Sequence, residues 1–258
     1  MSDPAAYQQY DWSLYGTVIN CGAYTAVDRA ETDEGRVACW KANATGPALL
    51  ARTCSEHGIT LVHVSSDYVF DGSHDIHTED EPLSPLGVYG QSKAAGDLAA
   101  AGCPSHYILR SSWVIGDGKN FVKTMAALSD RVADPDDGLG EVTVVDDQIG
   151  RLTFTVDIAR AIFHLLDTAA PYGTYNCTGS GEPASWAEVA RQVFELRNGN
   201  GAAVAPVSTE EYYASVSGPI APRPVHSALD LAKIEATGYA APAWNEGLKE
   251  YMSLISSK

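Results

Sequence analysis

The sequence predicts an α/β protein with a doubly wound parallel sheet, and three observations support this fold class. Apolar, β-branched runs alternate along the chain with segments of helical periodicity, as in a parallel sheet with helices on both faces. The run from Gly58 to Ser65 is mostly apolar, which is typical of a strand buried on both faces. Beyond about Asp130 this order loosens, and five prolines in the final third indicate a smaller, loop-rich C-terminal lobe.

In the first half of the chain, expected strands alternate with expected helices. Each strand is a short apolar run, and each helix carries apolar residues at helical spacing. The strands are expected at residues 17–21, 59–64 and 107–112, and the helices at residues 34–57, 88–101 and 120–129. Residues 70–86 are rich in Asp, Ser, His and Pro, and they are expected to form a surface loop that reaches over a pocket.

The second half begins with a break at the Asp-Pro-Asp-Asp-Gly stretch, residues 134–138. Strand and helix patterns resume after it, with strands expected at residues 142–145 and 174–177 and a helix between them at residues 155–166. A further helix is expected to begin after Ser185, because Ser185 and Glu188 have the spacing of a capping box.

Charge and composition exclude several classes of protein. A chain of 258 residues with 45% hydrophobic content can bury a substantial core. Its 17 basic and 33 acidic residues give a net charge of −16, which repels nucleic acid and anionic membrane surfaces. The sequence has no apolar run of about 18 residues and no signal-peptide pattern. We therefore expect no nucleic-acid partner, no membrane partner and a cytoplasmic location.

The cysteines and histidines show no pattern of a disulfide framework or of a metal centre. The five cysteines are scattered, odd in number and mostly in apolar surroundings, which favours reduced core thiols. None has the spacing of a zinc site, and the seven histidines are also dispersed. The sequence therefore predicts no metal site.

Hydroxyl and acidic residues follow the buried strand directly. Ser65, Ser66 and Asp67 are thereby placed at the carboxyl end of a strand, which is the edge where ligands bind in open α/β sheets. Tyr89 and Lys93 lie one turn apart on the next expected helix, so both can approach one reacting atom.

The spacing of these residues suggests acid catalysis. An ammonium group next to a phenol lowers the phenol pKa from its ordinary value of about 10. We expect Lys93 to have this effect on Tyr89, so that Tyr89 supplies a proton and Ser66 holds a carbonyl oxygen while a hydride arrives from the other side. On these residues alone, a half-buried tyrosine, a solvated lysine and a serine turn explain the pattern equally well.

The start of the chain lacks one expected unit. A doubly wound dinucleotide-binding sheet opens with a strand, a glycine-rich turn and a helix, but residues 1–15 contain no glycine. The sheet is therefore expected to be incomplete. We expect the chain to be a C-terminal fragment of an enzyme or of a fusion protein, with weak or no binding of a dinucleotide on its own.

Motifs along most of the chain point to one family. The matching segments are residues 20–31 (NCGAYTAVDRAE), 65–72 (SSDYVFDG), 88–93 (VYGQSK), 110–114 (RSSWV), 120–125 (NFVKTM), 147–153 (DQIGRLT) and 223–227 (RPVHS). Together they resemble the dTDP-4-dehydrorhamnose reductases, which are extended short-chain dehydrogenase/reductases. Leu152 stands where this family has proline, and Pro222 where an arginine often precedes Arg223.

The resemblance implies a Rossmann-like fold and an oxidoreductase. Residues 1–140 would form a partial dinucleotide-binding domain, and residues 141–258 mainly a substrate-binding lobe with segments that return to the sheet. The implied reaction is reduction of dTDP-4-dehydro-L-rhamnose to dTDP-L-rhamnose by hydride transfer from NADPH or NADH, within dTDP-rhamnose biosynthesis.

The resemblance also assigns roles to single residues. Ser66, Tyr89 and Lys93 match the catalytic triad, and Ser66 keeps the hydroxyl of the threonine that is usual there. The implied cofactor-binding residues are Gly22, Ala23, Thr25, Tyr89 and Lys93. The implied substrate-binding residues are Asp67, Tyr68 and Trp113, together with Lys123, Arg151 and Arg223 as cations for the diphosphate.

Several alternatives stay open at this stage. The same fold also serves as a regulatory subunit of methionine adenosyltransferase, and related enzymes reduce other nucleotide sugars. The sequence does not decide between NADH and NADPH or between a monomer and a homodimer. It also leaves open whether a further domain is fused upstream and whether magnesium is required.

Overall fold

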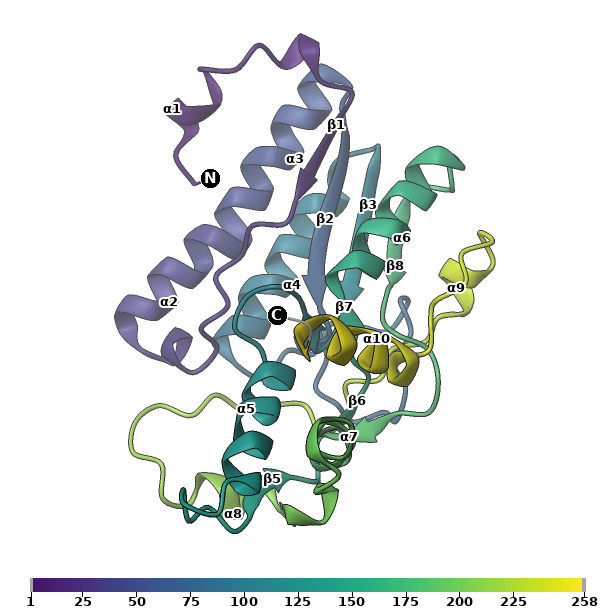
Figure 1. Cartoon of the computed structure of the whole chain (residues 1–258). Coiled ribbons are helices and arrows are strands. Elements are labelled where there is room, and N and C mark those ends of the chain that lie inside the picture. The colour runs from purple at the N-terminus through teal and green to yellow at the C-terminus, as the bar shows by residue number, and fades with distance from the viewer. Residues whose placement is uncertain (1, 257–258) are drawn as a thin grey trace.

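Four parallel strands form the central sheet within residues 2–256, which are the residues that this computed structural model describes (Figure 1). The strand order is β1 (Thr17–Asn20), β2 (Thr60–Ser66), β3 (His106–Ser111) and β8 (Gly173–Asn176). All four had been expected within one to two residues of these bounds. The last strand, β8, comes from the second half of the chain, so that half does return to the sheet. The division at residue 140 stays a prediction.

Helices cover both faces of this sheet, which confirms the doubly wound arrangement. Leu61 and Ile108 point to one face and pack with α3 (Gly46–His57) and α4 (Val88–Ala101). Their neighbours Val62 and Leu109 point to the other face and pack against α6 (Thr155–Asp167). This alternation follows from the two-residue period of a strand, and it explains why the strands are apolar at successive positions.

The expected long helix is present and contains one irregular turn. It consists of α2 (Asp33–Trp40), a π-helical turn at Lys41–Thr45, and α3, and it ends at Gly58 with a φ of 66°. The π-helical turn brings Asn43 against the loop after β1, where its side chain accepts a hydrogen bond from the Tyr24 backbone N–H at 2.8 Å and donates to the Tyr24 carbonyl oxygen at 3.1 Å. The helix thereby fixes the loop at the carboxyl end of β1.

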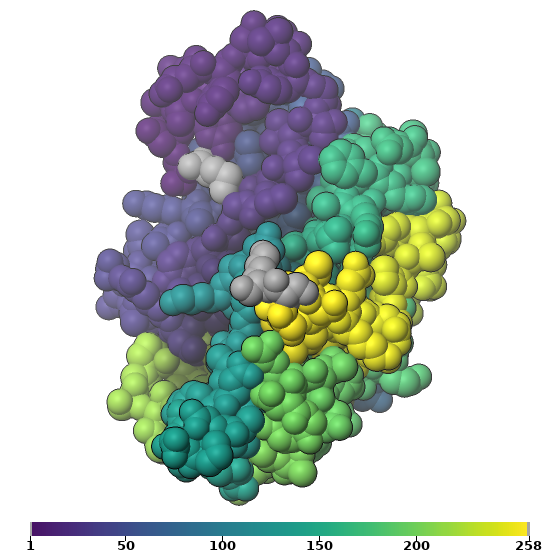
Figure 2. Space-filling view, viewed as in Figure 1, coloured from purple at the N-terminus to yellow at the C-terminus, as the bar shows by residue number. Residues whose placement is uncertain are grey.

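The second lobe has its own apolar core, built by α5 (Phe121–Ala133), α7 (Trp186–Asn198) and α10 (Trp244–Ser256). Figure 2 shows α5 in teal beside α7 in green at the bottom of the molecule. The predicted capping box at Ser185 and Glu188 is confirmed. The shorter elements of this half are β4 (Val114–Ile115), β5 (Val142–Val145), β6 (Ile149–Gly150), β7 (Thr153–Phe154), β9 (Ala184–Ser185), β10 (Val204–Val207), α8 (Thr209–Tyr213) and α9 (Ala232–Glu235).

The segment at residues 70–86 differs from the expected surface loop. It contains no helix or strand, as predicted, but Phe70 and His77 are completely buried. Their rings stack with centroids 4.7 Å apart, and His77 shares a hydrogen bond with Glu81 at 2.9 Å. The segment is therefore packed against the sheet by Phe70 and His77, while residues 73–76 remain exposed.

The chain begins with α1 (Pro4–Tyr7) and a short 3-10 turn at Trp12–Leu14. Within residues 2–256, no strand with a glycine-rich turn precedes β1, and β1 pairs with β2 alone. The expectation that the chain is part of a longer protein stays a prediction. No helix in the described part of the chain is long and apolar enough to cross a bilayer.

Candidate active site

The site begins where β2 ends, at the buried residue Ser66. The Ser66 hydroxyl donates a hydrogen bond to Asp67 Oδ1 at 3.0 Å and accepts one from the Tyr68 backbone N–H at 3.2 Å. The second contact caps the short 3-10 turn Asp67–Val69. Ser66, Asp67 and Tyr68 therefore lie close together at the carboxyl edge of the sheet. We call this place the catalytic corner.

Tyr89 reaches this corner from the first turn of α4. This helix has no capping side chain of its own at Gly87, and Glu31 accepts a hydrogen bond from the Val88 N–H at 2.8 Å instead. The Tyr89 ring meets the Tyr68 ring edge to face, with centroids 5.4 Å apart, and its hydroxyl lies near enough to Ser66 for that residue to lower the Tyr89 pKa. The predicted meeting of Ser66 and Tyr89 is therefore present.

Lys93 lies one turn further along α4 and is buried. Its amine donates a hydrogen bond to the Val64 carbonyl oxygen at 2.8 Å. Burial lowers the pKa of this amine, and the neighbouring Asp97 acts in the opposite direction. Lys93 thus points to the backbone of β2 at the same strand end as Ser66.

The expected effect of Lys93 on the Tyr89 phenol is wrong for this structure. Burial raises the pKa of Tyr89, the nearby Ser66 lowers it, and the Asp67 carboxylate raises it again. Desolvation outweighs the remaining contributions because the half-buried Tyr89 side chain packs against the Tyr68 ring and the apolar cluster around Val88. The phenol therefore carries its proton at neutral pH, which is the state of a general acid.

Asp67 allows a test by pH. Burial raises its pKa from 3.8 to about 6, although the nearby hydroxyl groups of Ser227 and Ser66 act in the opposite direction. Because the folded protein favours the neutral carboxyl group, this residue should destabilise the fold progressively as the pH rises from about 4 through about 6. We expect Asp67→Asn to remove this loss, so that the variant becomes more stable than the wild type at neutral pH. Urea unfolding of both proteins at several pH values measures this difference in the free energy of unfolding.

The control for this experiment is Asp80→Asn, which changes an exposed carboxylate of the neighbouring loop. It should keep the pH dependence of the wild type. Parallel stability curves for the wild type and Asp67→Asn would contradict the expected burial penalty.

The loop after β1 forms the other side of this edge. Gly22, Ala23 and Thr25 are exposed there, and the Gly22 N–H donates to the Asn20 side chain at 3.3 Å. Tyr24, between them, turns inward and packs near Tyr89. The exposed part of this loop thus consists of small residues on a fixed backbone, which allows a flat ligand to approach closely.

A cavity of about 270 Å³ lies next to Tyr68 on the side of the second lobe. Its wall comes from several separate segments, and its lining residues are Tyr68, Phe121, Met125, Thr143, Val144, Val145, Gln148, Trp186, Tyr212, Tyr213 and Arg223. Tyr68 lines this cavity and also contacts Tyr89, so the cavity adjoins the catalytic corner. We call it the aromatic cavity.

Arg223 is the predicted cation that the structure places in the aromatic cavity. Its guanidinium donates to both carboxylate oxygens of Asp28 at 2.9 Å and lies over the Tyr213 ring, 4.9 Å from the centroid. Asp28 belongs to the loop region after β1, so this ion pair joins the two halves of the chain at the site.

Trp113 has a different position from the one expected. It stacks on Trp186, with ring centroids 3.6 Å apart and planes at 15°, and Trp186 rather than Trp113 lines the aromatic cavity. Trp113 therefore supports the ring that faces the cavity. Sequence reasoning missed Trp186, whose one local signal is its place directly after the capping residue Ser185.

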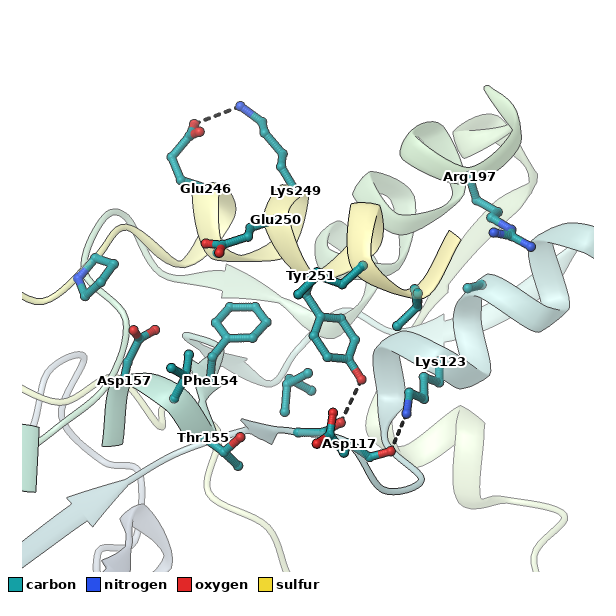
Figure 3. A pocket seen from close by; sticks show the side chains of 18 of the residues that line it. Asp117, Lys123, Phe154, Thr155, Asp157, Arg197, Glu246, Lys249, Glu250 and Tyr251 are labelled. Atoms are coloured by element: carbon teal, nitrogen blue, oxygen red, sulfur yellow. Dashed lines mark hydrogen bonds and ion pairs between the residues drawn. The ribbon is translucent and has the colours of Figure 1, made fainter. Parts of the chain in front are cut away.

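Lys123 and Arg151 are not brought to this site. Lys123 lines a separate cavity of about 960 Å³ between α5, α6 and α10, where its amine donates to the Asp117 carbonyl oxygen (Figure 3). Arg151 donates to the Leu229 carbonyl oxygen at 3.0 Å and lines a third cavity with Asp230. The expectation that both bind the substrate diphosphate is therefore not supported by their positions.

Comparisons with known proteins show which proteins this chain is similar to. The dTDP-4-dehydrorhamnose reductase of Mycobacterium tuberculosis is 37% identical over 238 residues, which are 89% of this chain and 73% of that protein. A solved dTDP-4-dehydrorhamnose reductase from Clostridium acetobutylicum superposes with a TM-score of 0.87 at 37% identity, covering 99% of this chain and 86% of that one.

A second solved reductase, from Bacillus anthracis in complex with NADP, has a TM-score of 0.85 at 34% identity and covers 98% of this chain and 85% of its own. The family model described as the RmlD substrate binding domain matches residues 8–256. On this match and on these relatives, the chain belongs to the RmlD substrate binding domain family.

Proposed function

We propose that this protein reduces the C4 ketone of dTDP-4-dehydro-L-rhamnose to give dTDP-L-rhamnose, with NADPH or NADH as the reductant. The observation that carries the proposal is the contact between Ser66 and a protonated Tyr89 beside the aromatic cavity. The relatives named dTDP-4-dehydrorhamnose reductase support the choice of this sugar nucleotide.

The residues at the strand ends fit the nicotinamide and ribose part of the cofactor. Gly22, Ala23 and Thr25 present an exposed, sterically open loop, and Lys93 uses one of its three N–H donors on Val64. Its other two donors would serve ribose hydroxyls next to Tyr89. When bound, the reduced nicotinamide supplies a hydride to the ketone carbon.

The protein's own residues handle the proton. Tyr89 donates its hydroxyl proton to the ketone oxygen, because its raised pKa keeps that proton in place until negative charge develops on the oxygen. Ser66 orients the same oxygen by a hydrogen bond and then stabilises the Tyr89 phenolate. The positive charge of Lys93, which lies one turn away on α4, also stabilises that phenolate.

The aromatic cavity suits the nucleotide part of the substrate. Its rings, including Trp186 with Trp113 stacked behind it, offer flat apolar surfaces to a thymine base. Arg223 is placed to bind the diphosphate. On substrate binding, the diphosphate would replace Asp28 as the partner of the Arg223 guanidinium. Tyr68 lines this cavity and contacts Tyr89, and so would contact the sugar, while the buried Asp67 beside Ser66 would support that edge of the sugar site.

The direct test is to incubate the protein with NADPH and dTDP-4-dehydro-L-rhamnose and to follow NADPH oxidation and the sugar product. We expect dTDP-L-rhamnose to form, and a UDP-linked 4-ketosugar to react far more slowly. Turnover of another dTDP-ketosugar in preference to this one would redirect the proposal to a related reductase, and no turnover of any ketosugar would refute it.

The proposal includes a cytoplasmic location, with the dTDP-sugar as the small-molecule partner. The cysteines support it, because Cys21, Cys39, Cys54, Cys103 and Cys177 are all unpaired. A homodimer, a fused upstream domain and the choice between the two cofactors stay open.

A further inference from the structure

A buried charge cluster lies directly beneath the catalytic corner. Tyr89, Lys93 and Asp97 are spaced four residues apart on α4, so they line one face of the helix. Asp97 is 2% exposed, Lys93 2% and Arg110, which comes from β3, 5%. The row on α4 therefore continues from the proposed acid through the amine to a carboxylate that no water reaches.

Asp97 holds Arg110 tightly with one of its two oxygens. Arg110 Nε donates to Asp97 Oδ2 at 3.0 Å, and Nη1 of the same guanidinium donates to the Glu79 carbonyl oxygen at 3.1 Å. The guanidinium also lies over the Phe70 ring, 5.1 Å from its centroid. Arg110 is thus fixed from three sides and cannot follow a change at Asp97.

The other oxygen, Asp97 Oδ1, is buried and lacks a close donor. His63 Nε2 on β2 lies 3.9 Å away, which is too far for a hydrogen bond, and Oδ1 has no partner within hydrogen-bonding geometry. A carboxylate whose sole function is to pair with Arg110 has no need of a second, uncompensated oxygen. Burial raises the pKa of Asp97, whereas Arg110 and Lys93 lower it, and the charged carboxylate in turn raises the pKa of Lys93.

The other titratable groups around Lys93 do not supply this charge. Burial lowers the pKa of His63 to about 3, so His63 is neutral. Burial also raises the pKa of the Cys39 thiol on α2, which keeps that thiol protonated. Ser65 on β2 is uncharged, and its hydroxyl has no hydrogen-bond partner in the part of the chain that the structure describes. The Asp97 carboxylate thus pairs directly with Arg110 and acts on Lys93, one turn away on α4, through its charge alone.

We propose that Asp97 is a positioning residue of the active site, whose buried carboxylate keeps the Lys93 amine charged and directed at the end of β2, with Arg110 setting the strength of that interaction. This inference rests on the proposed function for its role in turnover. The electrostatic link between Asp97 and Lys93 can be measured without turnover.

The experiment follows the titration of Lys93 by NMR in protein labelled with ¹³C at lysine Cε, using Lys93→Met to assign the signal. In Asp97→Asn, we expect Lys93 to titrate about 1 to 3 units lower than in the wild type, because an opposite charge nearby is lost. In Arg110→Gln, we expect a shift in the other direction, because a like charge is lost. Asp97→Glu should restore most of the wild-type value.

Turnover gives a second, separate readout. We expect kcat of Asp97→Asn to fall by about tenfold or more, with its alkaline limb moved to lower pH and little change in KM for the sugar. Asp157→Asn is the matched control, since it also breaks a buried aspartate's ion pair with an arginine, Arg160, at 2.9 Å, but on α6. It should change stability and leave the titration of Lys93 unchanged.

Opposite shifts in Asp97→Asn and Arg110→Gln support the proposal, and an unchanged Lys93 titration in either variant overturns it. If Asp97→Asn does not fold, Arg110→Gln and Asp97→Glu carry the same comparison. Opposite shifts in a protein whose wild type reduces no ketosugar would support the electrostatic link and refute the proposed function alone.

Discussion

Replacing Tyr89 with phenylalanine is expected to lower turnover by about 10²- to 10⁴-fold, which is the usual contribution of a positioned general acid. The ring keeps its edge-to-face contact with Tyr68, and only the hydroxyl that meets Ser66 is lost. Substrate binding should therefore change little, and the free energy of unfolding should stay within about 1 kcal/mol of the wild type. Steady-state kinetics and urea unfolding of the same preparation measure both effects.

Tyr107→Phe is the matched control. Tyr107 is a buried tyrosine away from the site, and its hydroxyl donates to the Ala170 carbonyl oxygen at 2.5 Å on the α6 face of the sheet. Its loss should cost stability and leave kcat unchanged. If Tyr89→Phe kept wild-type turnover, Tyr89 would not be the acid. A protein with no turnover to lose would instead agree with a binding subunit of the same fold.

Adding one methyl group at Gly90 is expected to have a large effect on folding. A Cβ at this position would lie 2.2 Å from the Tyr68 carbonyl oxygen, which is a backbone atom and cannot rotate away. Helix α4 must therefore move away from the end of β2. We expect Gly90→Ala to lower the free energy of unfolding by about 1–3 kcal/mol, although alanine favours a helix over glycine by about 1 kcal/mol.

Because Tyr89 precedes this glycine, Gly90→Ala should also separate Tyr89 from Ser66 and lower kcat. Gly118→Ala is the control, since a Cβ there has nothing within 4 Å. Urea unfolding measures the stability of both variants, and steady-state kinetics measures their kcat. Equal stability of the two variants would contradict the close approach of α4 to the end of β2.

The sequence predicted the elements whose signals are local. Helix α4 has the expected bounds, Val88–Ala101, because a glycine and prolines before it and a Gly-Cys-Pro sequence after it limit the helix at both ends. The capping box at Ser185 was correct for the same reason. The meeting of Ser66 and Tyr89 was also predicted, because a strand end and a helix start have fixed places in this sheet.

Other features were missed although a local signal existed. Helix α10 was not expected, because prolines in the final third were interpreted as loop residues. Pro242 lies two residues before Trp244, where proline precedes a helix without breaking it. The position of Lys123 could also have been anticipated. Phe121 and Met125 are four residues apart and face the aromatic cavity, so a residue between them faces away.

The aromatic cavity itself could not be predicted from local pattern. Its wall joins Tyr68, Phe121, Trp186 and Tyr213, which are separated by tens of residues and come together only when the second lobe packs. The raised pKa of Tyr89 is equally a tertiary effect, since it depends on how completely neighbouring segments enclose the ring. Sequence spacing gives the proximity of two groups but not the solvent around them.

The unpaired side of β1 has a consequence for handling the protein. Ile19 on this strand is 42% exposed, and the backbone N–H and C=O groups along that side have no strand beside them in the described residues. Such an edge templates the addition of a strand from a second copy, so concentrated samples should aggregate through it. A lysine in place of Ile19 would act as a gatekeeper and improve long-term storage.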